Sequence, residues 1–135
     1  MPTWLPCGKQ RYYIDEEALF WELHGEVTAT EIHGITDILV ALHRQHGVAL
    51  AVCDARNSSA ITPEARKAIS DRHTAGTAVA APSVIFGGSV IQRTLLPLVL
   101  RAIRLLGAKP PEIDFVATEQ EAHAWLARKR KQAPR

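Results

Sequence analysis

The chain has 135 residues and a mass of 14.9 kDa, enough for one domain with a buried core but not for two of ordinary size. Hydrophobic residues make up 47% and charged residues 22% of it, which excludes a mainly disordered chain. Its 16 Lys and Arg against 14 Asp and Glu give a net charge of +2, too small to indicate a nucleic-acid-binding protein. The two cysteines, Cys7 and Cys53, are too few for a disulfide scaffold or a cysteine-rich zinc fold.

The start of the chain does not read as a signal peptide, because Met1–Gly8 lacks both a basic segment and a continuous apolar run. The longest apolar stretch, residues 84–106, is interrupted by Arg93, Arg101 and Arg104, which argue against a membrane span. We therefore expect a cytoplasmic protein in which Cys53 is a buried, reduced thiol.

The N-terminal third predicts a hairpin followed by a helix. Residues 11–15 and 18–24 are rich in aromatic and β-branched residues, and alternate side chains of the second stretch would face opposite sides of a half-buried strand. Thr28 or Thr30 can cap the helix, which Gly47 stops.

The middle of the chain alternates strands and helices. Val48–Cys53 is a continuous apolar run, which predicts a strand covered on both faces, and a loop is expected over residues 55–61. Thr62 then caps a helix with Pro63 in its first turn. Residues 79–86 predict the next strand, in which Pro82 marks a start, a bulge or an edge.

The C-terminal part predicts a helix, a strand and a last helix. The first helix runs from about Ser89 to Leu106; Pro97 implies either a start near Thr94 or a kink. Residues 113–117 predict the last strand, and the capping box that begins at Thr118 starts the terminal helix. The basic end of this helix is expected to be solvated.

The predicted order is β-β-α-β-α-β-α-β-α, which indicates a single α/β domain: a mixed, mostly parallel central sheet flanked by about four helices. We assign residues 11–128 to this domain, residues 1–10 to an N-terminal extension and residues 129–135 to a basic C-terminal tail.

Several segments resemble the SpoIIAA-like branch of the STAS superfamily, namely VALAVCDARN, TPEARKAI, LLPLVLRAIRLLG and FVATEQEAHAWL. The resemblance covers roughly Arg11 to Arg128 and rests on element order and sequence texture. Bacterial members of this branch are small stand-alone cytoplasmic proteins, and the fold resembles both anti-sigma-factor antagonists and CRAL-TRIO lipid-exchange domains. The resemblance therefore implies a non-enzymatic module that binds a protein or a ligand, although a fold alone does not fix a function.

The sequence departs from the antagonists of this superfamily where the helix capped by Thr62 begins. Those proteins carry an Asp-Ser-Ser-Gly motif whose serine is phosphorylated by a partner kinase, whereas this chain reads Ile-Thr-Pro-Glu-Ala over residues 61–65. Glu64 stands where a phosphorylatable serine would be, and Ser58 and Ser59 lie upstream of the motif. We therefore do not expect the phosphoswitch.

The helix over residues 94–106 carries more apolar surface than one sheet face can cover. Pro97, Arg101 and Arg104 form a narrow polar stripe and the remaining positions are apolar, while a surface helix needs an apolar face of about 100°. The excess predicts a homodimer, a protein partner or a small apolar, lipid-like ligand under the helix. Alternatively, neighbouring helices and the long arginine side chains cover it. The candidate contact residues are Leu96, Leu100, Arg101, Ile103 and Arg104.

A second candidate site is the expected loop after Cys53, with Asp54, Arg56, Ser58 and Ser59 as possible ligand- or partner-binding residues. Open α/β sheets bind ligands at the carboxyl ends of their strands, but short polar side chains in turns also bond loop amides. A hydrolase or transferase that uses this loop is the least favoured reading, because no nucleophile-elbow pattern is present. We assign no catalytic residue.

Two weaker signals carry no assignment. Residues 86–89 (Phe-Gly-Gly-Ser) could be an anion-binding turn but lack the further glycine and the lysine of phosphate-binding loops. His43 and His46 have no cysteine or carboxylate nearby to complete a zinc site, so we expect neither a metal nor a cofactor. The sequence thus predicts a non-enzymatic protein-binding module, with a carrier or sensor of a small apolar ligand as the alternative.

Overall fold

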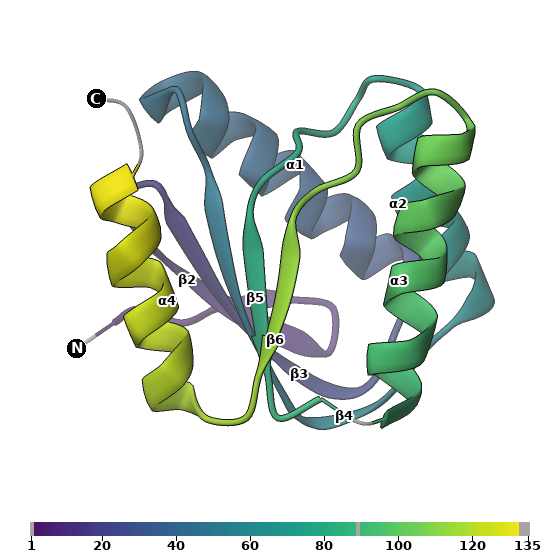
Figure 1. Cartoon of the computed structure of the whole chain (residues 1–135). Coiled ribbons are helices and arrows are strands. Elements are labelled where there is room, and N and C mark those ends of the chain that lie inside the picture. Colours follow the sequence, from purple (N-terminus) through teal and green to yellow (C-terminus); the bar gives the residue numbers. More distant parts are fainter. Residues whose placement is uncertain (1, 89, 133–135) are drawn as a thin grey trace.

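The computed structural model describes residues 2–88 and 90–132, which form one α/β domain (Figure 1). Its six-stranded sheet has the strands in chain order: β1 (Leu5–Cys7), β2 (Gln10–Asp15), β3 (Ala18–Val27), β4 (Leu50–Ile61), β5 (Ser83–Phe86) and β6 (Ile113–Val116). The first three strands are antiparallel and β3 to β6 are parallel. The helices are α1 (Ala29–His46), α2 (Pro63–Thr74), α3 (Val90–Leu105) and α4 (Glu119–Gln132). The predicted fold class is confirmed.

The helices are divided unequally between the two faces of the sheet (Figure 1). α1, α2 and α3 lie on one face, where side chains of α1 and α2 pack on Leu23, Cys53 and neighbouring strand residues. α4 lies alone on the other face, where Trp125 packs in a cluster with Phe20 and Phe86. No helix in the described part of the chain is long and apolar enough to cross a membrane.

A buried polar network joins the N-terminal hairpin to the start of α1. Glu31, with only 2% of its surface exposed, accepts hydrogen bonds from the amides of Lys9 (2.7 Å) and Thr28 (2.9 Å) and from Gln10 Nε2 (3.1 Å). The Gln10 amide also bonds the β3 backbone, since its Nε2 donates to the carbonyl oxygen of His24 at 3.2 Å. This network fixes how β2 and α1 lie against β3.

The helix starts follow the predicted caps. Thr28 is the N-cap of α1, with Glu31 completing a capping box, and the Ala65 amide donates to Thr62 Oγ1 (3.1 Å) at the start of α2. Gly47 ends α1 with φ 78°, a conformation that glycine adopts without steric cost.

The predicted loop over residues 55–61 is wrong, because β4 continues to Ile61. β3 runs parallel beside it as far as the pair Val27 and Ile61, with register shifts on the way, so the ladder continues past the polar residues. The exposed positions Arg56, Asn57 and Ser59 carry their side chains toward solvent, so strand geometry costs no burial of polar groups.

Two features differ from the sequence expectation, and the start of α3 decides between two stated alternatives. Residues 5–7, within the expected extension, pair with β2 as an edge strand that the sequence analysis did not predict. β5 begins only at Ser83, after Pro82, which cannot donate to a ladder. α3 begins at Val90 and carries Pro97 in its interior, so it does not start near Thr94. The expected glycine turn extends to Ser89, which lies outside the described residues.

The basic end of α4 is attached to the sheet and is not simply solvated. Arg130 donates through Nε to Glu17 Oε1 at 2.5 Å, and its Nη2 lies 3.2 Å from Asp15 Oδ2. Lys129 Nζ lies 2.7 Å from Glu112 Oε1. These contacts hold the C-terminal half of α4 to the turn between β2 and β3 and to the segment before β6.

Candidate functional site

α3 is apolar on both its inner and its outer side. Leu96, Val99 and Ile103 face inward and are almost fully buried. Leu98 is 57% exposed and Leu105 79% exposed, and Leu106, just after the helix, is 67% exposed. These three residues form the outer leucine face, which the sheet does not cover.

Two of the α3 candidates do not lie on that face. Ile103 has no exposed surface and Leu96 only 5%, so neither can contact a second protein in this fold, and Leu96 instead lines a cavity, where it stays a candidate for contact with a ligand. Both residues are buried because the largest continuous apolar stripe of the helix packs toward the sheet. Leu100 is half-buried, while Arg101 and Arg104 are exposed and flank the outer leucine face as the predicted polar stripe requires.

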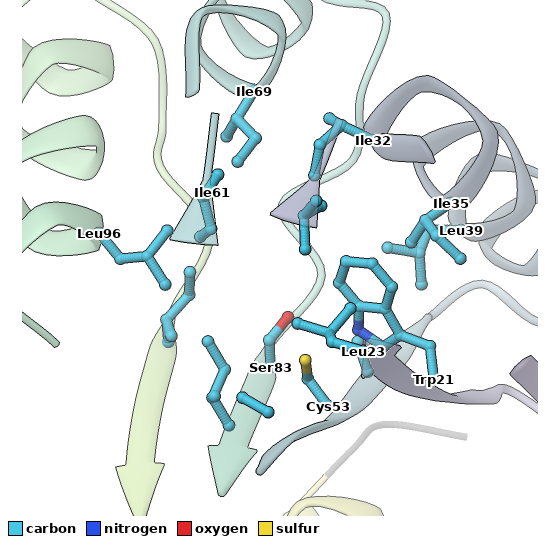
Figure 2. A pocket seen from close by; sticks show the side chains of 15 residues that line it. Trp21, Leu23, Ile32, Ile35, Leu39, Cys53, Ile61, Ile69, Ser83 and Leu96 are labelled. Carbon is cyan, nitrogen blue, oxygen red and sulfur yellow. The ribbon is translucent and has the colours of Figure 1, made fainter. Parts of the chain in front are cut away.

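An apolar cavity of about 120 Å³ lies between the sheet and helices α1, α2 and α3 (Figure 2). Figure 2 shows Leu96 of α3 pointing across it toward side chains of α1 such as Ile32, with Ile69 of α2 beside them. Strand residues form the floor, among them Cys53 and Ser83. This cavity lies beneath α3, where the sequence analysis expected a small apolar ligand.

The polar groups of the cavity wall are few: the Ser83 hydroxyl, the Cys53 thiol and the indole nitrogen of Trp21, which makes no hydrogen bond among the described residues. Ser83 Oγ donates to the carbonyl oxygen of Ala81 at 3.0 Å, and no fully buried side-chain nitrogen or oxygen of the described residues lacks a partner. Burial, with a further contribution from the charge of Asp54, raises the pKa of the Cys53 thiol far above its ordinary value, so the thiol stays neutral. Such a cavity favours an apolar group over water.

A side groove of about 310 Å³ lies between the starts of α2 and α3. Ile61 lines both this groove and the apolar cavity, and the adjacent residues Leu95 and Leu96 line the groove and the cavity respectively. Arg66 lies in the groove wall, with its Nη1 donating to the carbonyl oxygen of Ile61 at 2.8 Å. The groove therefore places a fixed cation next to the cavity.

The second sequence candidate lies on the opposite face, in a charged row that crosses three strands. The row consists of Arg11 on β2, Glu22 on β3, and Asp54 and Arg56 on β4; Arg11 pairs in register with Glu22, and Glu22 with Asp54. Each arginine holds its carboxylate through Nε and Nη2, at 3.2 and 3.0 Å for Arg11 and Glu22 and at 3.0 and 2.8 Å for Arg56 and Asp54.

Both carboxylates of the charged row are kept ionised. The hydrogen bond from Arg11 lowers the pKa of Glu22 in spite of partial burial, with help from His24, whose Nε2 lies 2.7 Å from Glu22 Oε1. Burial would raise the pKa of Asp54, but hydrogen bonds from the Arg56 side chain and amide outweigh it and hold this pKa below its ordinary value. The row thus lacks the carboxyl group of raised pKa that an acid catalyst needs.

Aromatic rings surround the charged row in a pocket of about 90 Å³. The Arg56 guanidinium lies 5.2 Å from the centre of the Phe86 ring and 3.9 Å from Glu119 of α4. Tyr13 and Phe20 stack with ring centres 4.6 Å apart. The chain's own arginines thus already take up the carboxylates and part of the aromatic surface.

The two serine candidates lie on β4 beyond the Asp54–Arg56 pair. Ser58 Oγ donates to the carbonyl oxygen of Gly25 on β3 at 3.4 Å, and Ser59 lies further along β4 with its side chain exposed. The structure therefore brings Asp54 and Arg56 together, but not with the α3 candidates, which lie across the sheet.

Sequence reasoning missed Arg11 and Glu22, although a signal was present. Strand alternation already placed Glu22 on the same side as Phe20, but nothing in the sequence gives the register that puts it beside Asp54. Among the residues described, no group of three or more His, Cys, Asp or Glu side chains is placed to hold a metal ion.

Comparison with known proteins supports the fold and leaves the function open. No protein-family model and no curated protein matches the chain. The solved structure of the anti-sigma factor antagonist SpoIIAA in its unphosphorylated form is similar, with a TM-score of 0.55 and 18% identity over 84% of this chain and 93% of that one. An uncharacterized protein of the DUF3478 family from Shewanella loihica PV-4, with a SpoIIAA-like fold, has a TM-score of 0.48 and 16% identity over 93% and 92%. The likeness to the antagonist shows that this chain has the SpoIIAA-like fold.

Proposed function

We propose that this protein is a non-enzymatic regulatory module that acts by binding another protein through the outer leucine face of α3. The observation that carries the proposal is the exposure of Leu98 and Leu105 on α3 and of Leu106 directly after it. Monomeric proteins rarely leave a large apolar patch uncovered, and a polar rim such as Arg101 and Arg104 is typical of protein interfaces. The likeness in fold to an anti-sigma factor antagonist supports a regulatory class of function by analogy.

A second copy of the chain is the simplest partner. Leu98 and Leu105 are seven residues apart and therefore lie on the same side of α3. A two-fold pairing of α3 with α3 would bury both residues twice, and symmetric dimers are the commonest protein assemblies. Arg101, which lies between them on the helix, would have to turn its charged end toward the rim of the interface.

We further propose that phosphorylation at the start of α2 does not switch this contact. Thr62, the hydroxyl residue at that position, uses its Oγ1 to cap the helix by accepting from the Ala65 amide. Glu64 follows Pro63 in the first turn, where its negative charge suits the helix N-terminus. Both roles are structural.

Light scattering over a range of protein concentrations tests the dimer. We expect the mass of a dimer for the natural chain and the mass of a monomer for Leu98→Glu and Leu105→Glu, with unchanged helix content. Ile14→Glu is the matched control, because Ile14 is 45% exposed but lies on β2, away from α3. A monomer at high concentration, or a dimer that both α3 substitutions leave intact, would refute the proposal.

A further inference from the structure

We propose that the apolar cavity and the side groove together bind a single-chain alkyl carboxylate, with the end of the chain in the cavity and the carboxylate beside Arg66. The proposal does not depend on the protein contact of α3, because the outer leucine face takes no part in it. The sequence predicted a small apolar ligand under α3. The proposal adds where this ligand binds, how it is oriented and which head group it carries.

The cavity can hold the end of an alkyl chain. Its walls are side chains such as Ile32, Leu39, Ile85 and Leu96, and the few polar groups among them carry no charge. At about 120 Å³ it has room for about four methylene-sized groups, since a group of the size of water takes about 30 Å³. It is slightly smaller than an engineered apolar cavity of about 150 Å³ that binds benzene.

The side groove can hold the rest of the chain. With its volume of about 310 Å³, cavity and groove reach the lower part of the range of about 300–1,000 Å³ that is usual for ligand sites. Ile61 stands between them, since it lines both. Rotation of this one side chain, which is only partly buried, would join the two spaces.

The charge in the groove favours an anionic head group. In the part of the chain described, the Arg66 guanidinium has no carboxylate partner, and its bond to the Ile61 carbonyl holds it where the cavity meets the groove. The start of α2 at Pro63 adds the positive end of a helix dipole. Glu26 also lines the groove, but its side chain is exposed and can turn to solvent.

Titration with octanoate, followed by calorimetry and by the methyl NMR signals of Ile61, Ile69 and Leu96, tests the site. We expect saturable binding that shifts these signals, at least tenfold weaker binding of propionate, whose chain is too short to reach the cavity, and weaker binding of octylamine, whose charge is reversed. Absence of saturable octanoate binding would refute the site, and stronger binding of octylamine would refute the assigned head group.

Two pairs of variants locate the ligand. Ala55→Ile fills the cavity, because Ala55 lines it and is 2% exposed, and should weaken octanoate binding at least tenfold, while Ala124→Ile on the exposed side of α4 should not. A melting curve shows whether Ala55→Ile folds. If it does not, Ala51→Val in the same cavity wall is used in its place.

Arg66→Gln should weaken octanoate binding about tenfold and leave octanol binding unchanged; Lys67→Gln, one residue along α2 and outside the groove, should change neither. If the folded cavity variant binds octanoate as well as the natural protein does, the alkyl chain does not lie in the cavity. If Arg66→Gln binds octanoate equally well, the carboxylate does not lie beside Arg66. Neither result would bear on the dimer test, since the two sites share no residue.

Discussion

The two faces of the sheet are covered by helices in different ways. On the face with α1, α2 and α3, the side chains between helices and sheet are almost entirely apolar, yet they leave a cavity of about 120 Å³. On the other face, the single helix α4 packs through Trp125 over part of the sheet, and the uncovered part carries arginine–carboxylate pairs and a smaller pocket of about 90 Å³. The larger apolar cavity lies on the face with more covering helices, so the number of helices over a face does not by itself decide how completely that face is filled.

The largest expected effect is on the α4 face. Trp125 is 2% exposed and its Nε1 donates to Asp114 Oδ2 at 2.7 Å. Because α4 has no neighbouring helix to close the gap, Trp125→Ala should lower the free energy of unfolding by about 3–5 kcal/mol. Urea denaturation measures it. Trp125→Phe keeps an aromatic ring but loses the hydrogen bond, and should lower the free energy of unfolding clearly less. If the two variants lose equal stability, packing of the ring is not what holds α4 on the sheet.

The next effect concerns the polar network beneath α1. Glu31→Gln replaces one of the two acceptor oxygens with an NH2 donor, which then faces the backbone amide of either Thr28 or Lys9, and should cost about 1–3 kcal/mol at pH 7. The control is Glu64→Gln in the first turn of α2, which is exposed and should cost much less.

The same network predicts a pH dependence of stability. Burial of Glu31 opposes ionisation, but the hydrogen bonds from Thr28, Gln10 and Lys9 outweigh it and lower the pKa of this carboxyl in the folded state. Its stabilising contribution is therefore complete above the ordinary glutamate pKa of about 4.3 and is lost as the pH falls through the lower folded value. Melting temperatures measured between pH 7 and 3 should fall less steeply for Glu31→Gln than for the natural chain; parallel curves would contradict this origin.

The smallest effect is expected in the charged row. Asp54→Asn removes the ion pair with Arg56, whose side chain is 56% exposed, so solvent screening limits the loss to about 1 kcal/mol or less. A loss as large as that of Trp125→Ala would show that the row is part of the core of this face, and the contrast between the two faces would disappear. Arg56→Ala should be measured alongside, because it removes the same ion pair but leaves Asp54 without its partner. Comparing the two variants separates the loss of the ion pair from the cost of leaving Asp54 unpaired.

Much of the fold could be predicted because it follows from local patterns. The apolar runs of β4 and β5, the caps Thr28 and Thr62 and the stop at Gly47 each depend on a few neighbouring residues. The end of β4 could not be predicted, because residues 56–59 are polar and form a strand only where β3 continues beside them. β1 was missed for the same reason, since three residues become a strand only through their partner β2.

The candidate sites were predicted less completely than the fold. The apolar excess of α3 is visible in the sequence, but which leucines face outward depends on the rotation of the helix on the sheet, and this rotation buried Ile103 and exposed Leu105. The charged row could be seen only in part, because Glu22 and Asp54 are 32 positions apart and meet through strand register.

By itself, the sequence determined the class of fold, the order of its elements and the presence of surplus apolar surface on one helix, since these follow from hydrophobic period and capping. The tertiary structure decided which side of α3 is free, where the cavity lies and which charges are paired. Those features arise where segments distant in sequence meet, and their relative placement is a property of packing that no local pattern encodes.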